Sequence, residues 1–477
     1  MLMNAPNFDL TQSHLDRIRA FYDAAPVRLN WLARSYRELL AHHYNLLIPK
    51  EASVLEIGCG AGYLLSRLQA RRKVGLDLSV TQIAQARERL PEAEFHVQAG
   101  EHIQLTEKFD YLIISDTLNL AADVQLLLER LHPLCHENTR LVFNFYSSLW
   151  RPVLSAAHRL GLKSSEPQSN WLASTDIANL LRLADWEMLH RQMRLLLPFK
   201  CLGLERFVNR WLAPLPGFRW CCLTVFCVAR PLPRPTTKKL SVSVIIPARN
   251  EGGNISAAIR RTPFMGAGTE LIFVEGHSRD DTWEQIQRGA RENPHLKITC
   301  LQQIGHGKGD AVRMGFAAAT GDILMILDAD LTMPPEELPK FYDVLAGNRA
   351  EFVNGCRLVY PMEDQAMQFL NMCANKSFGL IFTWLMGQTV KDTLCGTKVL
   401  SRAHYEKLAA GRAYFGDFDP FGDFDLLFGA AKLNLKIADV PIRYRERTYG
   451  STNIQRWKHG WLLLRMVFFA ARKLKFV

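Results

Sequence analysis

Two aspartates, Asp328 and Asp330, stand one residue apart directly after the apolar run ILMIL at residues 323–327. An apolar run of this length, followed by Pro334 and Pro335, is typical of a buried strand that ends at the acids. Two carboxylates in such a place need a partner, because taking an unpaired carboxylate out of water costs several kcal/mol. Mg²⁺ and Mn²⁺ prefer oxygen ligands and commonly bind one or two carboxylates together with substrate phosphates. The pair therefore predicts a site for a divalent metal and a diphosphate, although an isolated pair of this spacing is also typical of a solvated turn.

A second candidate site is a glycine-rich turn between a strand-like and a helix-like segment over residues 53–68. Its glycines are Gly58, Gly60 and Gly62. Glycine lets the backbone turn tightly and approach a ligand closely. A dinucleotide-binding loop has G-x-G-x-x-G spacing, and Tyr63 occupies the third glycine position here. The spacing excludes that loop and leaves the pattern E-x-G-x-G-x-G, which begins at Glu56.

This pattern resembles the first motif of class I S-adenosylmethionine-dependent methyltransferases, and the resemblance covers residues 50–230. It implies that the glycine loop, Gly58 to Gly62, passes under the methionine part of the cofactor S-adenosylmethionine, with Glu56 near it. It also implies that Asp77, at the end of the stretch KVGLDLS, binds the ribose hydroxyls. Class I methyltransferases work mainly by proximity and alignment, so the residues do not reveal the methyl acceptor.

The second half of the chain gives Asp328 and Asp330 a context of three ordered motifs. A β-branched stretch ends in PARNE at residues 247–251, ELIFVE ends at Glu275, and the glycine-rich HGKGD surrounds Lys308. Together they resemble family 2 glycosyltransferases of the GT-A fold, which implies a nucleotide-sugar donor and a metal, Mg²⁺ or Mn²⁺, bound by Asp328 and Asp330. The donor-binding residues that the resemblance implies are Pro247, Arg249, Asn250, Glu251, Glu275, Lys308, Arg313 and Asp328. The family's second strand usually ends in two aspartates, and Glu275 followed by glycine departs from that pattern.

Later segments resemble the polyprenyl-phosphate sugar transferases, the branch of this family that includes dolichyl-phosphate mannose synthases. The segments are Gly355-Cys356-Arg357, Asp392 with Gly396-Thr397-Lys398, and Arg447-Thr448-Tyr449-Gly450-Ser451-Thr452-Asn453-Ile454. Asn453 departs from the branch, which has lysine there. The resemblance implies a lipid phosphate acceptor, and the residues expected to bind its phosphate are Arg357, Lys398, Arg443, Arg445 and Arg447.

The acceptor class stays open between two alternatives. A polyprenyl phosphate has a second pKa of about 6 and is already an anionic nucleophile at neutral pH, so its site needs cations more than a base. A hydroxyl acceptor needs a general base, and Asp423 or Asp425 stands where hydroxyl-using relatives carry their catalytic acid. We expect Asp328 and Asp330 to be catalytic in both cases, and Asp423 or Asp425 in the second. A non-catalytic methyltransferase-like module accompanies that second alternative.

The elements that must position these residues alternate short β-branched strands with longer helical patterns. This alternation is typical of α/β domains with largely parallel sheets. The stretch RPLPRPTTKK at residues 230–239 is rich in proline and basic residues, which favours a semi-rigid linker. We predict a Rossmann-like methyltransferase domain with a helical N-terminal cap over residues 1–230, a linker over 231–240, and a GT-A domain over 241–477 that ends in an amphipathic helix.

The chain has 477 residues and a formal net charge of +11, which favours anionic partners. We expect a nucleotide-sugar, a lipid phosphate and an anionic membrane surface, and no nucleic acid, because no nucleic-acid module is present. Ten scattered cysteines favour a reducing cytosol, and no signal peptide is evident. No segment reaches the about 18–20 apolar residues of a membrane span. The stretch 456–476 mixes aromatic and basic residues, which predicts a cytoplasmic protein placed peripherally on the inner face of a membrane, with a packed core helix as the alternative.

Overall fold

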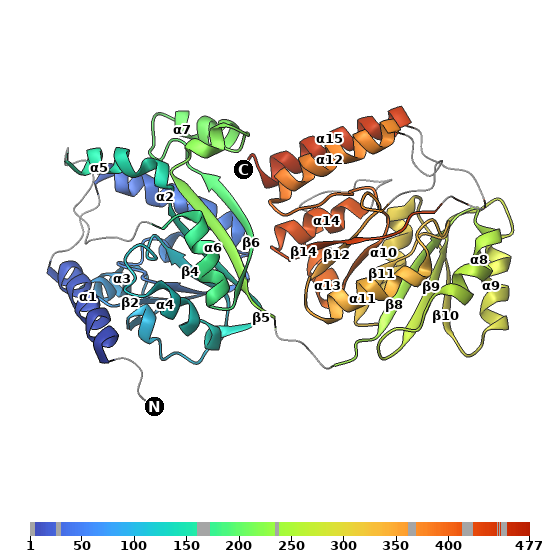
Figure 1. Cartoon of the computed structure of the whole chain (residues 1–477), viewed down its shortest axis with the longest axis horizontal. Helices are drawn as coiled ribbons and strands as arrows, with labels where there is room; N and C mark the ends of the chain where they lie inside the picture. Colours follow the sequence, from blue (N-terminus) through green and yellow to red (C-terminus); the bar gives the residue numbers. More distant parts are fainter. Residues whose placement is uncertain are drawn as a thin grey trace. The chain divides into compact units, whose positions relative to one another are not determined.

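The computed structural model describes residues 5–24, 30–159, 172–233, 238–360, 369–412, 423–445, 447, 449 and 456–477. The chain divides into two compact units, Met1–Leu232 together with Phe476–Val477, and Pro233–Lys475 (Figure 1). This division falls inside the predicted linker. Each unit contains a seven-stranded sheet flanked by helices, so both units are α/β folds, as the alternation of strand and helix patterns predicts.

The sheet of the first unit has the strand order β3-β2-β1-β4-β5-β7-β6. Its strands are β1 (Ser53–Ile57), β2 (Arg72–Asp77), β3 (Glu94–Val97), β4 (Phe109–Ser115), β5 (Cys135–Tyr146), β6 (Trp186–Arg194) and β7 (Thr224–Pro231). Strands β1 to β5 pair in parallel, whereas β7 runs antiparallel to β5 and β6, so the sheet is mixed. The strand β1 is buried at four of its five residues, Val54 to Ile57, as expected for a strand whose two faces are both covered.

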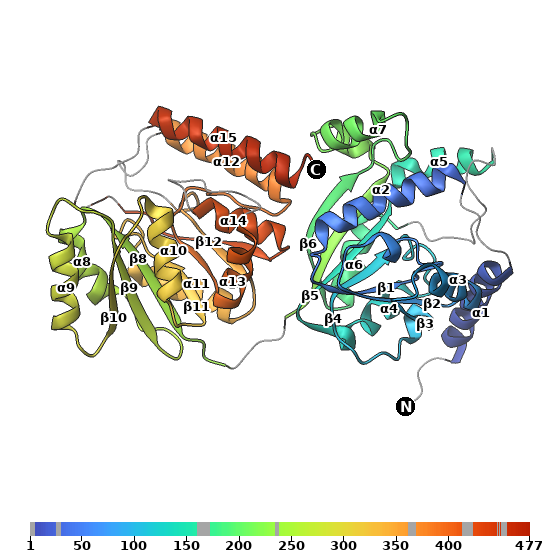
Figure 2. The same ribbon diagram turned by 180° about the vertical axis from the view of Figure 1, so that it is seen from behind.

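Helices of the first unit cover both faces of this sheet (Figure 2). They are α1 (Ala5–Ala24), α2 (Trp31–Leu47), α3 (Val80–Arg89), α4 (Val124–Arg130), α5 (Arg151–Arg159), α6 (Ser174–Leu183) and α7 (Leu204–Phe207). Leu40 of α2 and Ile83 of α3 pack against one face, and Leu127 of α4 and Ile177 of α6 pack against the other. Helices α2, α3 and α4 have N-cap residues whose side chains accept a hydrogen bond from a backbone N–H of the first turn, which stabilises the start of a helix. These residues are Asn30, Ser79 and Asp123.

The sheet of the second unit has the strand order β10-β9-β8-β11-β13-β12-β14. Its strands are β8 (Val242–Ala248), β9 (Thr269–Glu275), β10 (Lys297–Gln302), β11 (Ile323–Ile326), β12 (Phe352–Cys356), β13 (Lys398–Ser401) and β14 (Ile437–Pro441). The four strands β10, β9, β8 and β11 are parallel, and β13 runs antiparallel to β11 and β12. The parallel half therefore carries the strand ends at which the sequence places the acids.

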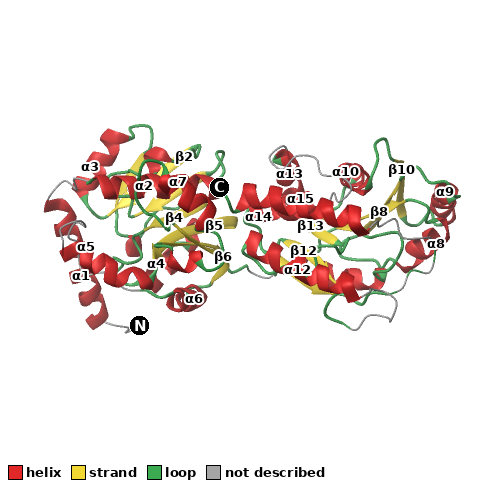
Figure 3. Cartoon of the chain, turned by 90° about the horizontal axis from the view of Figure 1, so that it is seen from above, coloured by secondary structure: helices red, strands yellow, loops and turns green. Residues whose placement is uncertain are grey.

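The helices of the second unit are α8 (Gly252–Arg261), α9 (Thr282–Glu292), α10 (Lys308–Ala318), α11 (Leu338–Ala346), α12 (Phe369–Met386), α13 (Arg402–Ala410), α14 (Asp423–Lys432) and α15 (Arg456–Leu474). Helices α8, α9 and α11 pack on one face, and α10 packs on the other, where Phe316 meets Tyr405 of α13. Helices α12 and α15 lie side by side (Figure 3), and Phe382 of α12 stacks on Phe428 of α14. No described helix has both the length and the apolarity that crossing a membrane requires.

The two sheets share one topological feature. In each sheet, the first strand is followed by two strands added on one side of it, and the next strand is then added on its other side. The strand order therefore reverses between β1 and β4 in the first unit and between β8 and β11 in the second. In open α/β sheets, ligands bind outside the carboxyl ends of the strands at this switch point. The loops after β1, β2 and β4, and those after β8, β9 and β11, are therefore the places where a site is expected.

Glu270 of β9 connects three neighbouring strands of the second unit. Its buried carboxylate accepts hydrogen bonds from Ser243 Oγ of β8 (2.5 Å) and from the backbone N–H of Thr320 ahead of β11 (2.7 Å). It also pairs with Lys297 Nζ of β10 at 2.5 Å. Burial favours a higher pKa, but the bonds from Lys297, Ser243 and Thr320 outweigh it and lower the pKa of Glu270 from 4.5 to about 2.

We expect Glu270→Gln to lower the thermal midpoint of the second unit at pH 7. The variant loses charged hydrogen bonds, each of which contributes about 1.5–3 kcal/mol. Because the folded-state pKa lies below the ordinary value, this contribution is complete above about pH 5 and disappears as the pH falls from 4.5 towards 2. Thermal unfolding followed between pH 2 and 7 should therefore show wild type and variant converging at the acid end.

The matched control is Glu292→Gln, which removes a carboxylate from an exposed pair with Arg288 on α9. Exposed pairs contribute about 0–1 kcal/mol, so this change should have little effect at any pH. If the thermal midpoint of Glu270→Gln lay below that of wild type by the same amount at every pH from 2 to 7, the stabilising effect would not come from the Glu270 charge.

Candidate active sites

The glycine loop after β1 has left-handed backbone at all three predicted glycines, with φ of 72° at Gly58, 51° at Gly60 and 71° at Gly62. A side chain is strained in this region, which explains the residue type. Gly58 and Gly60 line a cavity of about 800 Å³. A Cβ at Gly62 would instead lie 3.2 Å from Cβ of Ala86 in α3. Two of the glycines thus face the cavity, and the third allows the helix to pack closely.

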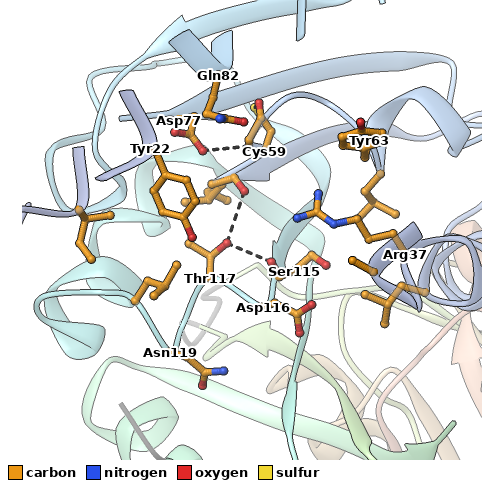
Figure 4. A pocket seen from close by; sticks show the side chains of 18 of the residues that line it. Tyr22, Arg37, Cys59, Tyr63, Asp77, Gln82, Ser115, Asp116, Thr117 and Asn119 are labelled. Atoms are coloured by element: carbon orange, nitrogen blue, oxygen red, sulfur yellow. Dashed lines mark hydrogen bonds between the residues drawn. The ribbon is translucent and has the colours of Figure 1, made fainter. Parts of the chain in front are cut away.

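The two acids predicted for the cofactor line the same cavity. Asp77, at the end of β2, accepts hydrogen bonds from the N–H groups of Gly60 (2.8 Å) and Ser79 (2.9 Å), and its burial raises its pKa (Figure 4). Glu56 is 3% exposed, burial raises its pKa to about 8, and its Oε2 has no hydrogen-bond partner among the described residues. A buried carboxyl without a partner on one oxygen fits a ligand that carries a positive charge or a donor. S-adenosylmethionine carries a sulfonium, an ammonium and two ribose hydroxyls.

Several residues of this cavity carry no motif and were not predicted. Helix α1 contributes Leu15 and Ile18. Helix α2 contributes Tyr36 and Arg37. Asp116 follows β4 directly, as Asp77 ends β2, so an acid at the end of a buried strand was an available signal. The side chains on α2 had no such signal, because only the fold brings that helix to the strand ends.

In the second unit, Asp328 and Asp330 follow β11, and a cation holds each of them. Lys308 Nζ lies 2.6 Å from Oδ1 of Asp328, and Arg447 Nη2 lies 2.7 Å from Oδ2 of Asp330. Burial favours a higher pKa at Asp328, but Lys308, Lys398 and Arg357 outweigh burial and hold that pKa below its usual value. Asp328 is therefore ionised, and Arg447 lies within ion-pair distance of Asp330.

The surroundings of this acid pair join three parts of the sequence. Arg447 also donates from Nη1 to Oε1 of Glu251 after β8 (2.9 Å). Burial raises the pKa of Glu251, and Arg447 opposes that effect. A Cβ at Gly396 would lie 2.0 Å from Oδ2 of Asp328 and 2.4 Å from Nζ of Lys308, so glycine is needed for this ion pair to pack against the backbone. The predicted metal, donor and late arginine motifs thus meet at one point.

The donor set at this point fits a divalent metal shared with a phosphate ligand. Among the residues that the structure describes, no group of three or more His, Cys, Asp and Glu side chains could hold a metal by itself. Two carboxylates, each now paired with a cationic side chain, suit Mg²⁺ or Mn²⁺, which usually keep further positions for water or substrate phosphates.

The other predicted donor residues lie in the loops that frame the acids. Asn250 has φ 56°, its N–H donates to Ser278 Oγ (3.0 Å), and its Oδ1 accepts from the N–H of Arg279 (2.8 Å). Glu275 ends β9 and accepts from the N–H of Ser278 (2.5 Å). These bonds tie the loop after β8 to the loop after β9. The remaining predicted residues are Pro247 on β8, the exposed Arg249 and the half-buried Arg313 on α10.

The predicted acceptor residues have different partners. Arg357 makes two bonds to the buried Asp392, from Nε to Oδ2 (2.7 Å) and from Nη2 to Oδ1 (2.8 Å). Lys398 is fully buried, and its Nζ donates to the carbonyl of Cys395. Arg443 and Arg445 are exposed, and the N–H of Arg445 bonds to the carbonyl of Thr332, beside the acid pair (2.9 Å). Arg447 lies on the acids themselves, as described above.

The candidate bases for a hydroxyl acceptor are only partly described. Asp425 of α14 accepts a bond from Nε of Arg412 at 3.3 Å. Asp423 begins α14, and its side chain lies outside the described residues. Asn453, at the predicted lysine position, also lies outside them.

Two family models match the chain, one in each unit. Residues 48–184 match "Methyltransferase domain", and residues 243–408 match "Glycosyl transferase family 2". Each match covers the strand ends described above for its unit.

Curated relatives match the second unit. The undecaprenyl-phosphate 4-deoxy-4-formamido-L-arabinose transferase of Pseudomonas aeruginosa (strain LESB58) is 30% identical over 150 residues, which cover 29% of this chain and 43% of that protein. The dolichol-phosphate mannosyltransferase of Pyrococcus furiosus is 34% identical over 221 residues, 45% of this chain and 60% of that protein. The matched part thus spans about half the length of these relatives.

Solved structures resemble each unit. A possible histamine N-methyltransferase from Thermotoga maritima, described as dependent on S-adenosylmethionine, covers 46% of this chain with 99% of its own (16% identity, TM-score 0.34). Glucosyl-3-phosphoglycerate synthase from Mycobacterium tuberculosis, with Mn²⁺ and uridine diphosphate, covers 49% of this chain with 80% of its own (21% identity, TM-score 0.35). The chain thus combines a region that matches methyltransferase domains with a region that matches family 2 glycosyltransferases, and the curated relatives of the second region are polyprenyl-phosphate sugar transferases.

Proposed function

We propose that the chain is a bifunctional transferase. Its second unit transfers a sugar from a nucleotide-sugar to a polyprenyl phosphate and depends on Mg²⁺ or Mn²⁺, and its first unit transfers a methyl group from S-adenosylmethionine. The observation that carries the sugar-transfer proposal is the acid pair after β11, where Lys308 pairs with Asp328 against Gly396 and Arg447 pairs with Asp330. The names of the homologues support the lipid phosphate acceptor.

In this proposal the chain's own residues supply binding and charge. Asp328 and Asp330 hold the metal, which neutralises the leaving diphosphate when it is bound. Lys308 adds a positive charge at the same carboxylate. The exposed Arg443 and Arg445 are the cations available to the acceptor phosphate, whereas Arg357 and Lys398 support the site from within the unit.

The alternative acceptor is a soluble hydroxyl compound with Asp423 or Asp425 as the base. The bond between Asp425 and Arg412 favours the phosphate acceptor, because a carboxylate already paired with an arginine is a weaker proton acceptor. A phosphate acceptor needs no base, and its site needs the cations that the acid pair and the late arginines bring together.

We expect Asp330→Asn to reduce sugar transfer at least 100-fold with a thermal midpoint close to that of wild type. The change removes one charge from the metal site and keeps the side chain's size. The assay measures transfer of radiolabelled sugar from a panel of UDP- and GDP-sugars to undecaprenyl phosphate, with Mn²⁺ present or chelated.

The control is Asp343→Asn, an exposed carboxylate on α11, which should behave as wild type. Near-normal transfer by Asp330→Asn would remove the metal assignment. Transfer by the wild type to glycerol or free sugars, with none to undecaprenyl phosphate, would favour the hydroxyl alternative.

The first unit should lose cofactor affinity when Asp77 changes. Asp77→Asn removes the charge that faces the ribose hydroxyls, and charged hydrogen bonds contribute about 1.5–3 kcal/mol each, so S-adenosylmethionine should bind at least about tenfold more weakly. Calorimetric titration measures the affinity, and sugar transfer should not change. Glu92→Gln, an exposed acid of the same unit, is the control. Equal affinity of the Asp77→Asn and Glu92→Gln variants would show that the ribose contact is misassigned.

The acceptor in this proposal requires the second unit to approach a membrane surface, and α15 supports such a placement. One side of α15 is buried through Leu463, Met466 and Ala470. Trp461 and Phe468 are 68% and 62% exposed. An outer apolar face with Arg465 and Arg472 beside it suits the headgroup boundary, where each basic residue contributes about 1 kcal/mol on an anionic surface.

We expect the protein to float with liposomes that contain phosphatidylglycerol, and to be released as the salt concentration rises. The double variant Trp461→Ala/Phe468→Ala should float several-fold less. Phe264→Ala, which removes another exposed aromatic ring of the same unit, should float as wild type does. Flotation that is equal for both variants would exclude α15 as the membrane contact.

A further inference from the structure

The cavity of the first unit extends well beyond the cofactor residues. Figure 4 shows Asp77 and Gln82 on one side, near the ends of β2 and the start of α3, and Asp116 and Asn119 on the other, after β4. The lining continues past β4 to Tyr146 at the end of β5 and onto helix α5. The β1–β2 side carries the glycine loop, so the β4–β5 side is the part of the cavity that remains for a second ligand.

One corner of this second part combines a carboxylate with two aromatic rings. Tyr36 Oη donates to Oδ1 of Asp116 at 3.3 Å, and the Tyr36 ring lies 6.0 Å from the ring of Tyr146. Burial and the neighbouring carboxylate raise the pKa of Tyr36 well above its usual value, so its hydroxyl keeps the proton that it donates. Asn144 Nδ2 donates to the same oxygen, and Tyr44 fixes Asn144 by donating to its Oδ1 (2.7 Å).

The backbone at this corner is held in an unusual conformation. Asp116 has φ 57°, in the left-handed region that non-glycine residues rarely adopt. Strain of this kind persists where surrounding contacts fix the residue, and it is found often at ligand sites. The bonds from Tyr36 and Asn144 provide that fixation, and they place the carboxylate at the cavity wall.

The charges of the lining favour a cation. Among the described residues that line the cavity, Asp77, Glu101 and Asp116 are acids besides Glu56, whose pKa burial raises to about 8, and Arg37 carries the positive charge. A carboxylate beside aromatic rings is a favourable place for an ammonium group, because the ring face attracts a cation by about 0.5–2 kcal/mol.

The wall beyond the corner is apolar. Trp150, Val153, Leu154 and Ala157, at or on α5, together with Phe199, line it. Val153 is half exposed, so this wall reaches the surface. Such a surface offers nothing to a polar or phosphorylated body and favours an alkyl chain or an aromatic ring.

We propose that the methyl acceptor of the first unit is an amine with an apolar body, whose nitrogen lies at Asp116, Tyr36 and Tyr146 and whose body lies along α5. This inference rests on the proposed S-adenosylmethionine site. In the transfer, the lone pair of the deprotonated nitrogen forms the new N–CH₃ bond as the S–CH₃ bond breaks and S-adenosylhomocysteine leaves. The proton that the nitrogen loses passes to Asp116 or to water.

The test measures binding, so it does not require the natural acceptor. Wild-type protein saturated with S-adenosylhomocysteine is titrated calorimetrically with n-alkylamines from butylamine to octylamine, and with octanol and octanoate. Each added methylene should raise the affinity about fourfold, which corresponds to about 0.8 kcal/mol of burial. Octylamine should bind at least about tenfold more tightly than octanoate, because the corner is acidic.

Two variants separate the polar corner from the apolar wall. Asp116→Asn should lower octylamine affinity about tenfold or more and leave the affinities for octanol and S-adenosylmethionine nearly unchanged. Asparagine tolerates the left-handed backbone, so this change is the mildest that removes the charge. Leu154→Asn should flatten the dependence on chain length. Glu129→Gln, an exposed acid on α4 outside the cavity, should match wild type.

The outcomes are distinct. If S-adenosylmethionine and S-adenosylhomocysteine bind but octylamine does not, or if octanoate binds as tightly as octylamine, the amine assignment is wrong while the proposed cofactor function stands. If Asp116→Asn binds octylamine as the Glu129→Gln control does, the corner is not the ammonium site. If neither cofactor form binds, the proposed methyltransferase function fails and this inference fails with it.

Discussion

Carboxylates at the carboxyl ends of buried parallel strands are the constraint on which both units depend. A carboxylate in such a place needs a compensating partner, because the free energy of desolvating it is large compared with the net free energy of folding. Asp77 is compensated by backbone N–H groups, Asp116 by a tyrosine and an amide, and Asp328 and Asp330 by cationic side chains. The kind of compensation differs between the two units, and it determines which ligand each site favours.

Charge compensation in the second unit comes from far along the chain. Arg447 reaches Asp330 and Glu251 across 117 and 196 residues. Removing the carboxylate of Asp330 or Glu251 therefore changes the charge balance around Arg447, whose contacts join the two ends of the unit. Arg357 and Asp392 form a second, more deeply buried pair behind the site. Buried pairs of this kind add little net stability, but losing one partner leaves an uncompensated charge.

The sequence predicted the local features of both sites, and it missed the long-range ones. Glycines with left-handed backbone and acids at strand ends follow from a few consecutive residues, so Gly58, Gly60 and Asp328 could be recognised by spacing. The expected phosphate cluster of Arg357 and Lys398 with Arg447 could not be checked from spacing, because an arginine's partner depends on which carboxylate the fold brings near. Tyr36, on a helix far from β4 in sequence, shows the same limit: its bond to Asp116 exists only after the sheet is assembled.

The two kinds of compensation give the two sites opposite preferences. In the first unit, neutral donors bind Asp77 and Asp116 and do not cancel their charge, and the described lining of the cavity has a single arginine. The cavity therefore suits the cationic ligands that we propose for it. In the second unit, lysine and arginine already cancel the acid pair, and exposed arginines lie beside it. In the proposed function, a metal ion bound with a diphosphate would pair with the carboxylates, and the diphosphate would pair with the lysine and arginine that the metal displaces. In the proposed functions, one topology with acids at equivalent strand ends would serve ligands of opposite charge, because different residues balance those acids.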